Sequence, residues 1–283
     1  MTPLVVAAVL AAAVTHASWN AIAHGIRDQL LAFTLVGGGG ALCGLVMAAA
    51  TPLPAAGCWP FLLGSAVLHI VYQALLMQSF RLGDFGQMYP IARGTAPLVV
   101  TVLAAVFVHE VPGPWALAGV ALASAGLVGV ALWGIRGSGT PTHWPALAAA
   151  LATGLAIASY TTVDGLGVRA SGTPVGYIAW LMILEGLVIP LYALAVRRGR
   201  LLGELRPFAL RGLAGGVLSV FAYGLVLWAQ TRAPLAPIAA LRESSIIVGA
   251  AIGAVFFKER FGVPRIAAAG LMVLGISLML YNG

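Results

Sequence analysis

Residues 237–259 read PIAALRESSIIVGAAIGAVFFKE, a membrane-length apolar run that carries Arg242 and Glu243 about a third of the way along. Shifting the sequence by 149 positions (242 minus 93) lays Arg93 on Arg242. The same shift aligns four further pairs: Phe107 with Phe256, Glu110 with Glu259, Gly113 with Gly262 and Gly126 with Gly275. The chain is therefore a duplication. An arginine in the middle of a membrane helix costs about 2.5–3.5 kcal/mol on insertion scales, so we expect a chain that keeps it twice to use it.

The composition is that of an integral membrane protein. Hydrophobic residues make up 61% of the chain and charged residues 8%, with a mean hydropathy of +1.00, whereas soluble domains are about 25% charged. A bilayer core of about 30 Å needs about 20 helical residues, and 283 residues hold ten such spans. The net charge of +7 comes from basic turns between apolar runs, which is typical of orientation in a lipid bilayer and argues against a nucleic-acid partner.

Several other functions are disfavoured by what the sequence lacks. Cys43 and Cys58 are too few for a disulfide framework or a metal site, and no cofactor is expected. The sequence contains no G-x-x-x-x-G-K-[ST] phosphate loop, so the energy for any transport comes from a gradient or from a partner chain. The first apolar run has no basic residues before it and continues past Trp19, which indicates a first transmembrane helix and not a cleaved signal.

The expected fold is an all-α membrane protein of ten transmembrane helices. Residues 1–134 form a first repeat of five helices, 135–145 a glycine- and proline-rich linker, and 146–283 a second repeat. Because five is odd, the second repeat enters the membrane in the opposite sense, which predicts two inverted repeats around a central cavity. The spacing Gly40-x-x-x-Gly44 predicts a close helix contact. The expected helices span about 3–25, 30–50, 59–80, 85–108, 112–133, 146–164, 174–196, 208–230, 234–257 and 265–281.

The basic residues predict the orientation. Arg169 and Arg232 alone lie on the side of the termini. The turns on the opposite side contain eleven basic residues: Arg27, Arg81, Arg136, Arg197, Arg198, Arg200, Arg206, Arg211, Lys258, Arg260 and Arg265. Since lysine and arginine concentrate on the cytoplasmic side, both termini are expected to face away from the cytoplasm.

Polar side chains in the spans follow helical faces. His16, Trp19 and Asn20 have the spacing i, i+3, i+4, and His69, Tyr72 and Gln73 repeat it. In the second half, Tyr160 shares a stripe with Thr153 and Asp164, and Tyr223 with Ser219 and Gln230. The fifth and tenth helices are almost bare. We therefore expect the first, third, fourth, sixth, eighth and ninth helices to surround a wet cavity, with the bare pair outside it or at a homodimer contact.

Each polar residue has a plainer interpretation. A tyrosine, asparagine or glutamine in a membrane helix is more often an interhelical hydrogen-bond partner than a ligand contact, and His16 and His69 suit a packed core. A guanidinium is not neutralised by deprotonation, so Arg93 and Arg242 need an anion, water or an internal salt bridge to Glu185 or Glu243. These two glutamates are the only carboxylates expected well inside the spans, and each is a candidate proton carrier or amine ligand.

Neighbouring residues in a helix point about 100° apart, so Arg242 and Glu243 do not form a good pair with each other. We expect one of them to face the cavity and the other to meet a neighbouring helix. On the seventh helix, Glu185 follows Tyr177 and Trp180 toward mid-span.

Two similar helix endings carry a family resemblance: VFVHEVPGPWALAG at 106–119 and VFFKERFGVPRIAAAG at 255–270. Through these two segments the chain resembles the ten-helix EamA-type carriers of the drug/metabolite transporter superfamily. The resemblance implies a bacterial inner-membrane carrier with alternating access, and members commonly export amino acids, other metabolites or toxic compounds. Related organophosphate carriers hold phosphate with basic residues on the fourth and ninth helices, which resembles the placement of Arg93 and Arg242.

The first functional hypothesis is a secondary transporter for a small polar metabolite with an anionic group. Zwitterionic metabolites such as amino acids and aminophosphonates are included. Arg93 and Arg242 would bind the anion in turn, and Glu185 or Glu243 would bind an amino group or carry a proton. A second hypothesis is a proton-coupled exporter of cationic or aromatic compounds, with a cation–π site at Glu185 and the tryptophans. A membrane enzyme or scaffold is disfavoured, because no span holds a nucleophile beside a base. The pocket residues expected are His16, Trp19, Tyr72, Tyr160, Trp180 and Tyr223.

Overall fold

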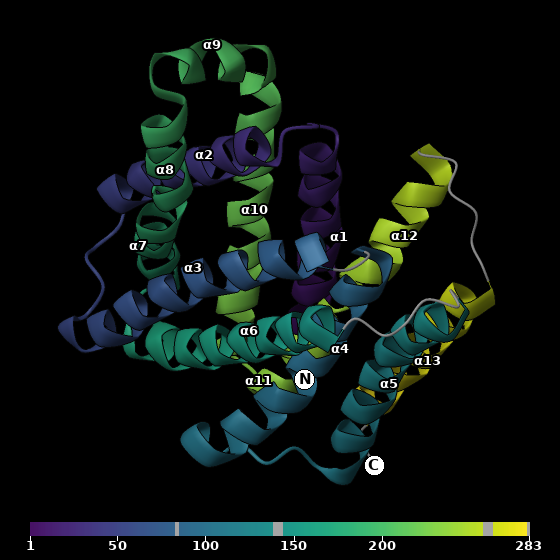
Figure 1. The fold of residues 1–283 in the computed structure, drawn as a ribbon. Helices are drawn as coiled ribbons and strands as arrows, with labels where there is room; N and C mark the ends of the chain where they lie inside the picture. The colour runs from purple at the N-terminus through teal and green to yellow at the C-terminus, as the bar shows by residue number, and fades with distance from the viewer. Residues whose placement is uncertain (83–84, 138–143, 257–262, 282–283) are drawn as a thin grey trace.

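The computed structural model describes residues 1–82, 85–137, 144–256 and 263–281, and in these ranges the chain is helical with no strand (Figure 1). The helices of the first half are α1 (Pro3–His24), α2 (Gln29–Ala50), α3 (Trp59–Leu82), α4 (Phe85–Leu103) and α5 (Pro114–Gly137). Those of the second half are α6 (Trp144–Ala170), α7 (Pro174–Gly186), α8 (Val188–Arg197), α9 (Leu201–Leu205), α10 (Ala209–Gln230), α11 (Leu235–Arg242), α12 (Ser245–Phe256) and α13 (Val263–Leu280). Short turns of other helix types are η1 (Ala56–Cys58), η2 (Ala104–Val108), η3 (Arg198–Arg200) and η4 (Arg206–Phe208).

The outside of the molecule is apolar. Val46, Leu210 and Val263 are 71%, 80% and 79% exposed, as expected of side chains that face lipid. Two shorter apolar helices, Pro114–Gly129 and Ile266–Leu280, accompany the longer ones. By length and composition, six described segments can cross a membrane: Pro3–Ala23, Gln29–Ala50, Ala56–Leu76, Met88–Val108, Trp144–Ala170 and Pro174–Gln230. These lengths and compositions are those of a multi-pass membrane protein.

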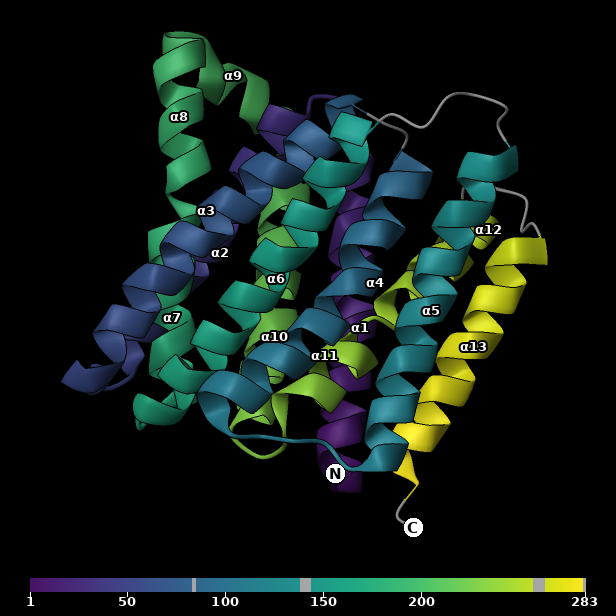
Figure 2. The same ribbon diagram turned by 60° about the horizontal axis from the view of Figure 1, so that its bottom comes forward.

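The helices pack in pairs that join the two halves of the chain. α1 packs along α10, α3 along α6, α2 along α7 and α5 along α13 (Figure 2). Small residues permit these contacts, because a Cβ on Gly44 would lie 2.6 Å from the carbonyl oxygen of Ala179. The close contact predicted from Gly40-x-x-x-Gly44 is thus confirmed, between α2 and α7. A Cβ on Gly275 would likewise lie 2.6 Å from the carbonyl oxygen of Gly119, between α13 and α5.

Two of the expected helices are broken. The expected helix 234–257 is split into α11 and α12 by a tight turn, in which the N–H groups of Glu243 and Ser244 donate to carbonyls three residues earlier. The expected helix 174–196 is split into α7 and α8 at Leu187. Pro190 explains this second break, because it has no N–H to donate to the carbonyl of Gly186. The prediction of two continuous helices was wrong.

One helix is longer than expected. We expected the sixth helix to end near Asp164, but α6 continues to Ala170. The glycines after Asp164 mark close packing and not a helix end, since a Cβ on Gly165 would lie 2.6 Å from Leu235 and one on Gly167 would lie 2.5 Å from Tyr177. Asp164 is therefore inside a helix and fully buried.

The bundle has two ends. The end that holds both termini, here the termini face, also holds the turns at 51–58, 109–113, 171–173 and 231–234 (Figure 2). The opposite end, here the basic face, holds the turn at 25–28 and the segment 198–208. At the basic face Arg197 ties α8 to its neighbours, with Nη2 2.6 Å from Asp28 Oδ2 and Nη1 3.3 Å from Glu204 Oε2.

Candidate functional site

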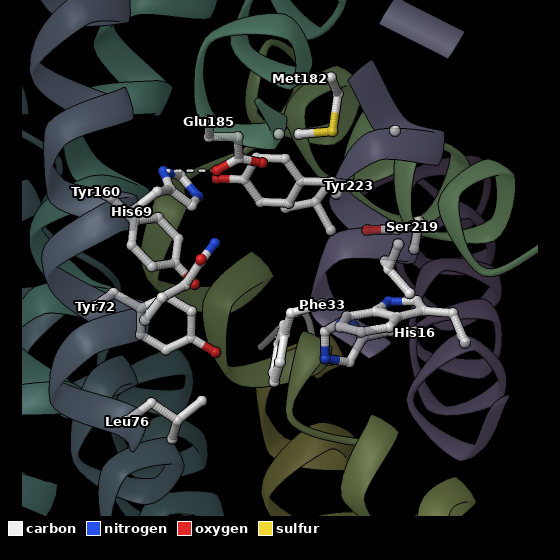
Figure 3. A pocket seen from close by; sticks show the side chains of 18 of the residues that line it. His16, Phe33, His69, Tyr72, Leu76, Tyr160, Met182, Glu185, Ser219 and Tyr223 are labelled. Atoms are coloured by element: carbon white, nitrogen blue, oxygen red, sulfur yellow. Dashed lines mark hydrogen bonds and ion pairs between the residues drawn. The ribbon is translucent and has the colours of Figure 1, made fainter. Parts of the chain in front are cut away.

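A cavity of about 150 Å³ lies among the helices (Figure 3). Each buried water needs about 10–15 Å³ by this measure, so the space holds on the order of ten waters or a solute with about as many non-hydrogen atoms. Its walls include Phe33 from the first half of α2 and Leu76 from the second half of α3. Both of these half-helices lie toward the basic face, so the cavity extends from the middle of the bundle in that direction. No residue of α5 or α13 within the described ranges lines it.

Ten of the thirteen predicted site residues line this cavity: His16, Trp19, His69, Tyr72, Gln73, Arg93, Tyr160, Glu185, Tyr223 and Arg242. In Figure 3, Tyr72 and Tyr160 face the open space from one side, and Phe33 and His16 from the other. The helical stripes of α1, α3, α6 and α10 therefore converge on one place. The second and seventh expected helices also contribute walls, which the predicted arrangement of six helices did not include.

Three predicted site residues lie elsewhere. The Nδ2 of Asn20 donates to the carbonyl of His16 at 2.8 Å, within its own helix. Trp180 packs edge-on against Trp59, with ring centroids 5.3 Å apart, at the border of an apolar cluster. Glu243 does not line the cavity and accepts a hydrogen bond from Nε of Arg93, which does.

Arg93 is held by an internal carboxylate. Its Nε donates to Glu243 Oε2 at 2.7 Å, and its Nη2 to Ser245 Oγ at 3.4 Å. The two charged side chains of this pair are 2% and 3% exposed. The prediction that Arg242 and Glu243 diverge, one to the cavity and the other to a neighbouring helix, is confirmed. Of the two expected carboxylate partners for an arginine, Glu243 is the one in place.

Arg242 has a different environment. It is 6% exposed and lines the cavity at the end of α11. Its Nη2 donates to the hydroxyl of Tyr160 at 3.0 Å, and its guanidinium carbon lies 5.9 Å from the centre of the Tyr223 ring. Its Nε is buried without a hydrogen-bond partner among the described residues. Because a buried guanidinium needs acceptors for its charge and its N–H groups, Arg242 can bind an anion that enters the cavity.

A second polar cluster lies on another wall. His69 stacks on Tyr160 with ring centroids 4.0 Å apart, and its Nδ1 lies 3.6 Å from Glu185 Oε2 (Figure 3). That carboxylate oxygen has no hydrogen bond among the described residues. The cluster can therefore take a proton or a cationic group of a solute.

Asp164 was missed as an internal carboxylate. It is fully buried and accepts hydrogen bonds from the hydroxyls of Tyr177, at 2.9 Å, and Tyr223. The statement that Glu185 and Glu243 are the only carboxylates inside the spans was therefore wrong. The available signal was the spacing, because Asp164 follows Tyr160 by four residues on the same stripe.

The apolar residues of the cavity wall were also missed, among them Phe33 and Met182. Phe33 lies in α2, where no polar periodicity marks an inward face, and Met182 lies in α7 three residues before Glu185. Only their neighbours in space distinguish them from lipid-facing residues.

Comparisons with known proteins agree with this architecture. The sequence profile of the EamA-like transporter family matches residues 144–281. No curated protein matches the sequence. Among solved structures, 27 chains match, and one crystal structure superimposes with a TM-score of 0.73 over 99% of this chain and 97% of the other, at 16% sequence identity. At that identity the likeness concerns the fold.

Proposed function

Because residues 144–281 match the EamA-like transporter family, we propose that the protein is a secondary transporter for a small polar solute with an anionic group. The family is one of membrane transporters. The observation that carries the substrate class is Arg242, a buried arginine at the cavity with an unpartnered Nε among the described residues. Amino acids and aminophosphonates have suitable size and charge, since Glu185 on the wall can hold an amino group.

The proposed architecture is ten transmembrane helices in two inverted repeats, residues 1–134 and 146–283, with 135–145 between them. Under the repeat, the contact of α3 with α6 corresponds to that of α10 with α1, and both are present. The contact of α2 with α7 and that of α5 with α13 each correspond to themselves. This is the pattern expected of a pseudo-two-fold axis in the membrane plane, and it supports alternating access.

In the proposed cycle the structure represents one of two end states. The cavity extends toward the basic face, and Asp164, four residues beyond Tyr160 toward the termini end of α6, accepts hydrogen bonds from Tyr177 and Tyr223. The excess of basic residues at the opposite end supports a cytoplasmic basic face with non-cytoplasmic termini in a bacterial inner membrane. In that orientation the cavity opens inward.

The test is thermal stabilisation of the purified protein by matched solutes. Aspartate and inorganic phosphate serve as anions, glycine and 2-aminoethylphosphonate as zwitterions, and tetraethylammonium as a cation. Bound ligand adds RT ln(1 + [L]/Kd) to stability, so millimolar solutes reveal weak binding. We expect anions or zwitterions to stabilise the protein and Arg242→Ala to lose the effect. The matched control is Arg232→Ala, which removes an arginine that stacks on Trp228 outside the cavity. Equal stabilisation of Arg242→Ala and the parent would refute the anion site.

A second candidate function is proton-coupled export of cationic or aromatic compounds. It is favoured by one observation: Glu185 Oε2 is buried without a hydrogen bond, on a wall with His69 and two tyrosines. If this function is correct, only tetraethylammonium stabilises the protein, lower pH weakens that effect, and Glu185→Gln abolishes it. Glu185 would then take up and release a proton during the transport cycle, and this exchange would couple transport to a proton gradient.

A further inference from the structure

Asp164 differs from the other carboxylates of the described ranges because it has no basic partner. The sequence contains eight acidic residues, of which Asp84 and Glu259 lie outside these ranges. Five of the other six lie in an ion pair with an arginine or a histidine: Asp28, Glu110, Glu185, Glu204 and Glu243. Asp164 is fully buried and has no such pair among the described residues. A carboxylate buried inside a membrane protein without a basic partner needs another source of positive charge.

The contacts of Asp164 are hydroxyl groups. Its Oδ1 accepts from the hydroxyl of Tyr177 at 2.9 Å, and its Oδ2 accepts from the hydroxyl of Tyr223. Ser65, which is fully buried on α3, supplies a third hydroxyl. Because a hydroxyl can donate to a carboxylate and accept from a carboxylic acid, these partners satisfy Asp164 both with and without a proton.

Few titratable groups face this carboxyl group. Those around Asp164 and its two tyrosines are Cys58 of η1, His69 of α3, Tyr160 of α6, Glu185 of α7 and Arg242 of α11. Of the charged groups in this set, Glu185 is beside His69, and Arg242 is bound to Tyr160. On α4, which also packs against α6, Arg93 is paired with Glu243. A proton is therefore the simplest positive charge that Asp164 can take up.

Asp164 lies between the cavity and the termini face. It follows the cavity residue Tyr160 by four positions and precedes the end of α6 at Ala170 by six, which is about 9 Å along the helix. Tyr223 joins it to the cavity, because the side chain of Tyr223 forms part of the wall and its hydroxyl binds Asp164 (Figure 3). On the termini side, the buried side chain of Leu235 lies against the next residue of α6.

We propose that Asp164 is the coupling-proton site of the transporter, which exchanges a proton with the cavity through Tyr223 in this state and with the termini face in the other end state. The proposal rests on the proposed function, since it assigns the driving ion of the same cycle. In the loading step, a hydronium ion in the cavity gives a proton to the Tyr223 oxygen, and the hydroxyl proton of Tyr223 passes to Asp164 Oδ2. Tyr223 stays neutral, and the carboxylate becomes a neutral acid. Release is the reverse of this step.

The proton and an anionic solute should favour each other. Tyr223 touches both sites, because the guanidinium carbon of Arg242 lies 5.9 Å from the centre of its ring. A charged Asp164 repels an anion at Arg242, whereas the neutral acid does not. Binding of one therefore strengthens binding of the other by the same factor, which favours movement of both in the same direction. The affinity for an anion should fall as the pH rises and Asp164 loses its proton.

The first measurement needs no solute. Infrared spectroscopy of the purified protein in lipid detects the C=O stretch of a protonated carboxyl group. We expect the parent to show such a band that weakens as the pH rises, and Asp164→Asn to lack it. Asp28→Asn, the same change at a carboxylate that is paired with Arg197, is the matched control and should keep the band. Asp164→Glu should shift the band, which identifies it even if the asparagine variant does not fold.

The second measurement is the Kd of the best anionic solute of the panel at acidic and at alkaline pH. The parent should bind about fivefold or more tightly at acidic pH. Asp164→Asn should bind with similar affinity at both, because an amide stays neutral, whereas Asp28→Asn should behave as the parent does. If Asp164→Asn keeps the full pH dependence of the parent, that dependence belongs to His69 or Glu185, and the proposal is overturned.

Two infrared results would also overturn the proposal. One is a carboxyl spectrum of Asp164→Asn that equals that of the parent at every pH. The other is a band that sodium removes at constant pH, which would assign the site to a metal cation. If no anion of the panel binds, yet the band titrates in the parent and is lost in Asp164→Asn, the anion site of the proposed function fails and the proton site stands.

Discussion

Arg93 and Arg242, which the 149-residue shift of the sequence aligns, have different partners. Arg93 lies within the continuous helix α4 and is neutralised by Glu243 at 2.7 Å, with Ser245 as a second acceptor. Arg242 ends α11 and has, among the described residues, a single hydrogen bond to a neutral tyrosine hydroxyl. One arginine is therefore part of the internal structure, and the other retains the capacity to bind an anion.

The residue after each arginine explains the difference. Under the 149-residue shift Glu243 corresponds to Gly94. Gly94 lies against α5, where a Cβ would be 2.8 Å from that of Leu127, so no side chain fits there. Of these two aligned positions, only 243 carries a carboxylate, and that carboxylate binds Arg93.

The largest expected effect is that of Glu243→Gln on stability. The change leaves Arg93 buried and charged without its counterion, and breaking a buried ion pair typically costs about 3–5 kcal/mol. Thermal unfolding in detergent measures the loss. Replacing both partners, Arg93→Gln with Glu243→Gln, should recover part of it because no isolated charge remains. A single variant as stable as the parent would show that Arg93 finds another anion or water.

Arg242→Ala should instead change binding with little change in stability. Loss of hydrogen bonds to a charged group costs about 1.5–3 kcal/mol, so the Kd of an anionic or zwitterionic ligand should rise about 10- to 100-fold. Arg242→Lys should show an intermediate loss, since an ammonium keeps the charge without the planar guanidinium fork. Titration of the purified protein with the best solute of the panel measures both. A Kd unchanged in Arg242→Ala would remove the distinction between the arginines.

Gly94→Ala tests why position 94, which the 149-residue shift aligns with Glu243, carries no side chain. The new Cβ would meet Leu127 on α5, and overpacking of this kind costs about 1–3 kcal/mol. The matched control is Gly129→Ala on α5, where a Cβ meets open space; there the better helix propensity of alanine should be neutral or slightly stabilising. Thermal unfolding compares the two. Equal stability of both variants would mean that α4 and α5 separate easily and that sterics do not exclude a side chain at position 94.

The sequence predicted the apolar spans and most of the polar residues of the cavity wall, because both follow from local periodicity. His16 and Trp19, or His69 and Tyr72, share a face by helical geometry alone. The sequence also indicated that Glu185 and Glu243 lie in apolar surroundings and need a partner. It did not identify the partner of Glu243, because Arg93 and Glu243 meet only after the two halves of the chain pack against each other.

The breaks and ends of helices, and the packing of single side chains, could not be predicted from local periodicity. The turn between α11 and α12 contains no proline or glycine at 243–244, so no local signal predicts it. In this turn Glu243 contacts Arg93 of α4. The sixth helix was expected to end near Asp164, but it continues through Gly165 and Gly167, which accommodate Leu235 and Tyr177. Trp180 has the periodicity of a cavity residue and instead packs on Trp59. In each case a contact between distant segments decided the outcome.

The smallest effect concerns the hydrogen bond that orients Arg242. Tyr160→Phe removes the hydroxyl that accepts from Arg242 Nη2 at 3.0 Å and keeps the ring that stacks on His69. A single hydrogen bond contributes about 0.5–1.5 kcal/mol, so the Kd of an anionic ligand should rise about 2- to 12-fold, less than in Arg242→Ala. Tyr192→Phe, on the exposed surface of α8, is the matched control. A loss as large as that of Arg242→Ala would mean that the hydroxyl contacts the solute directly, and no loss would mean that Arg242 is positioned by its helix alone.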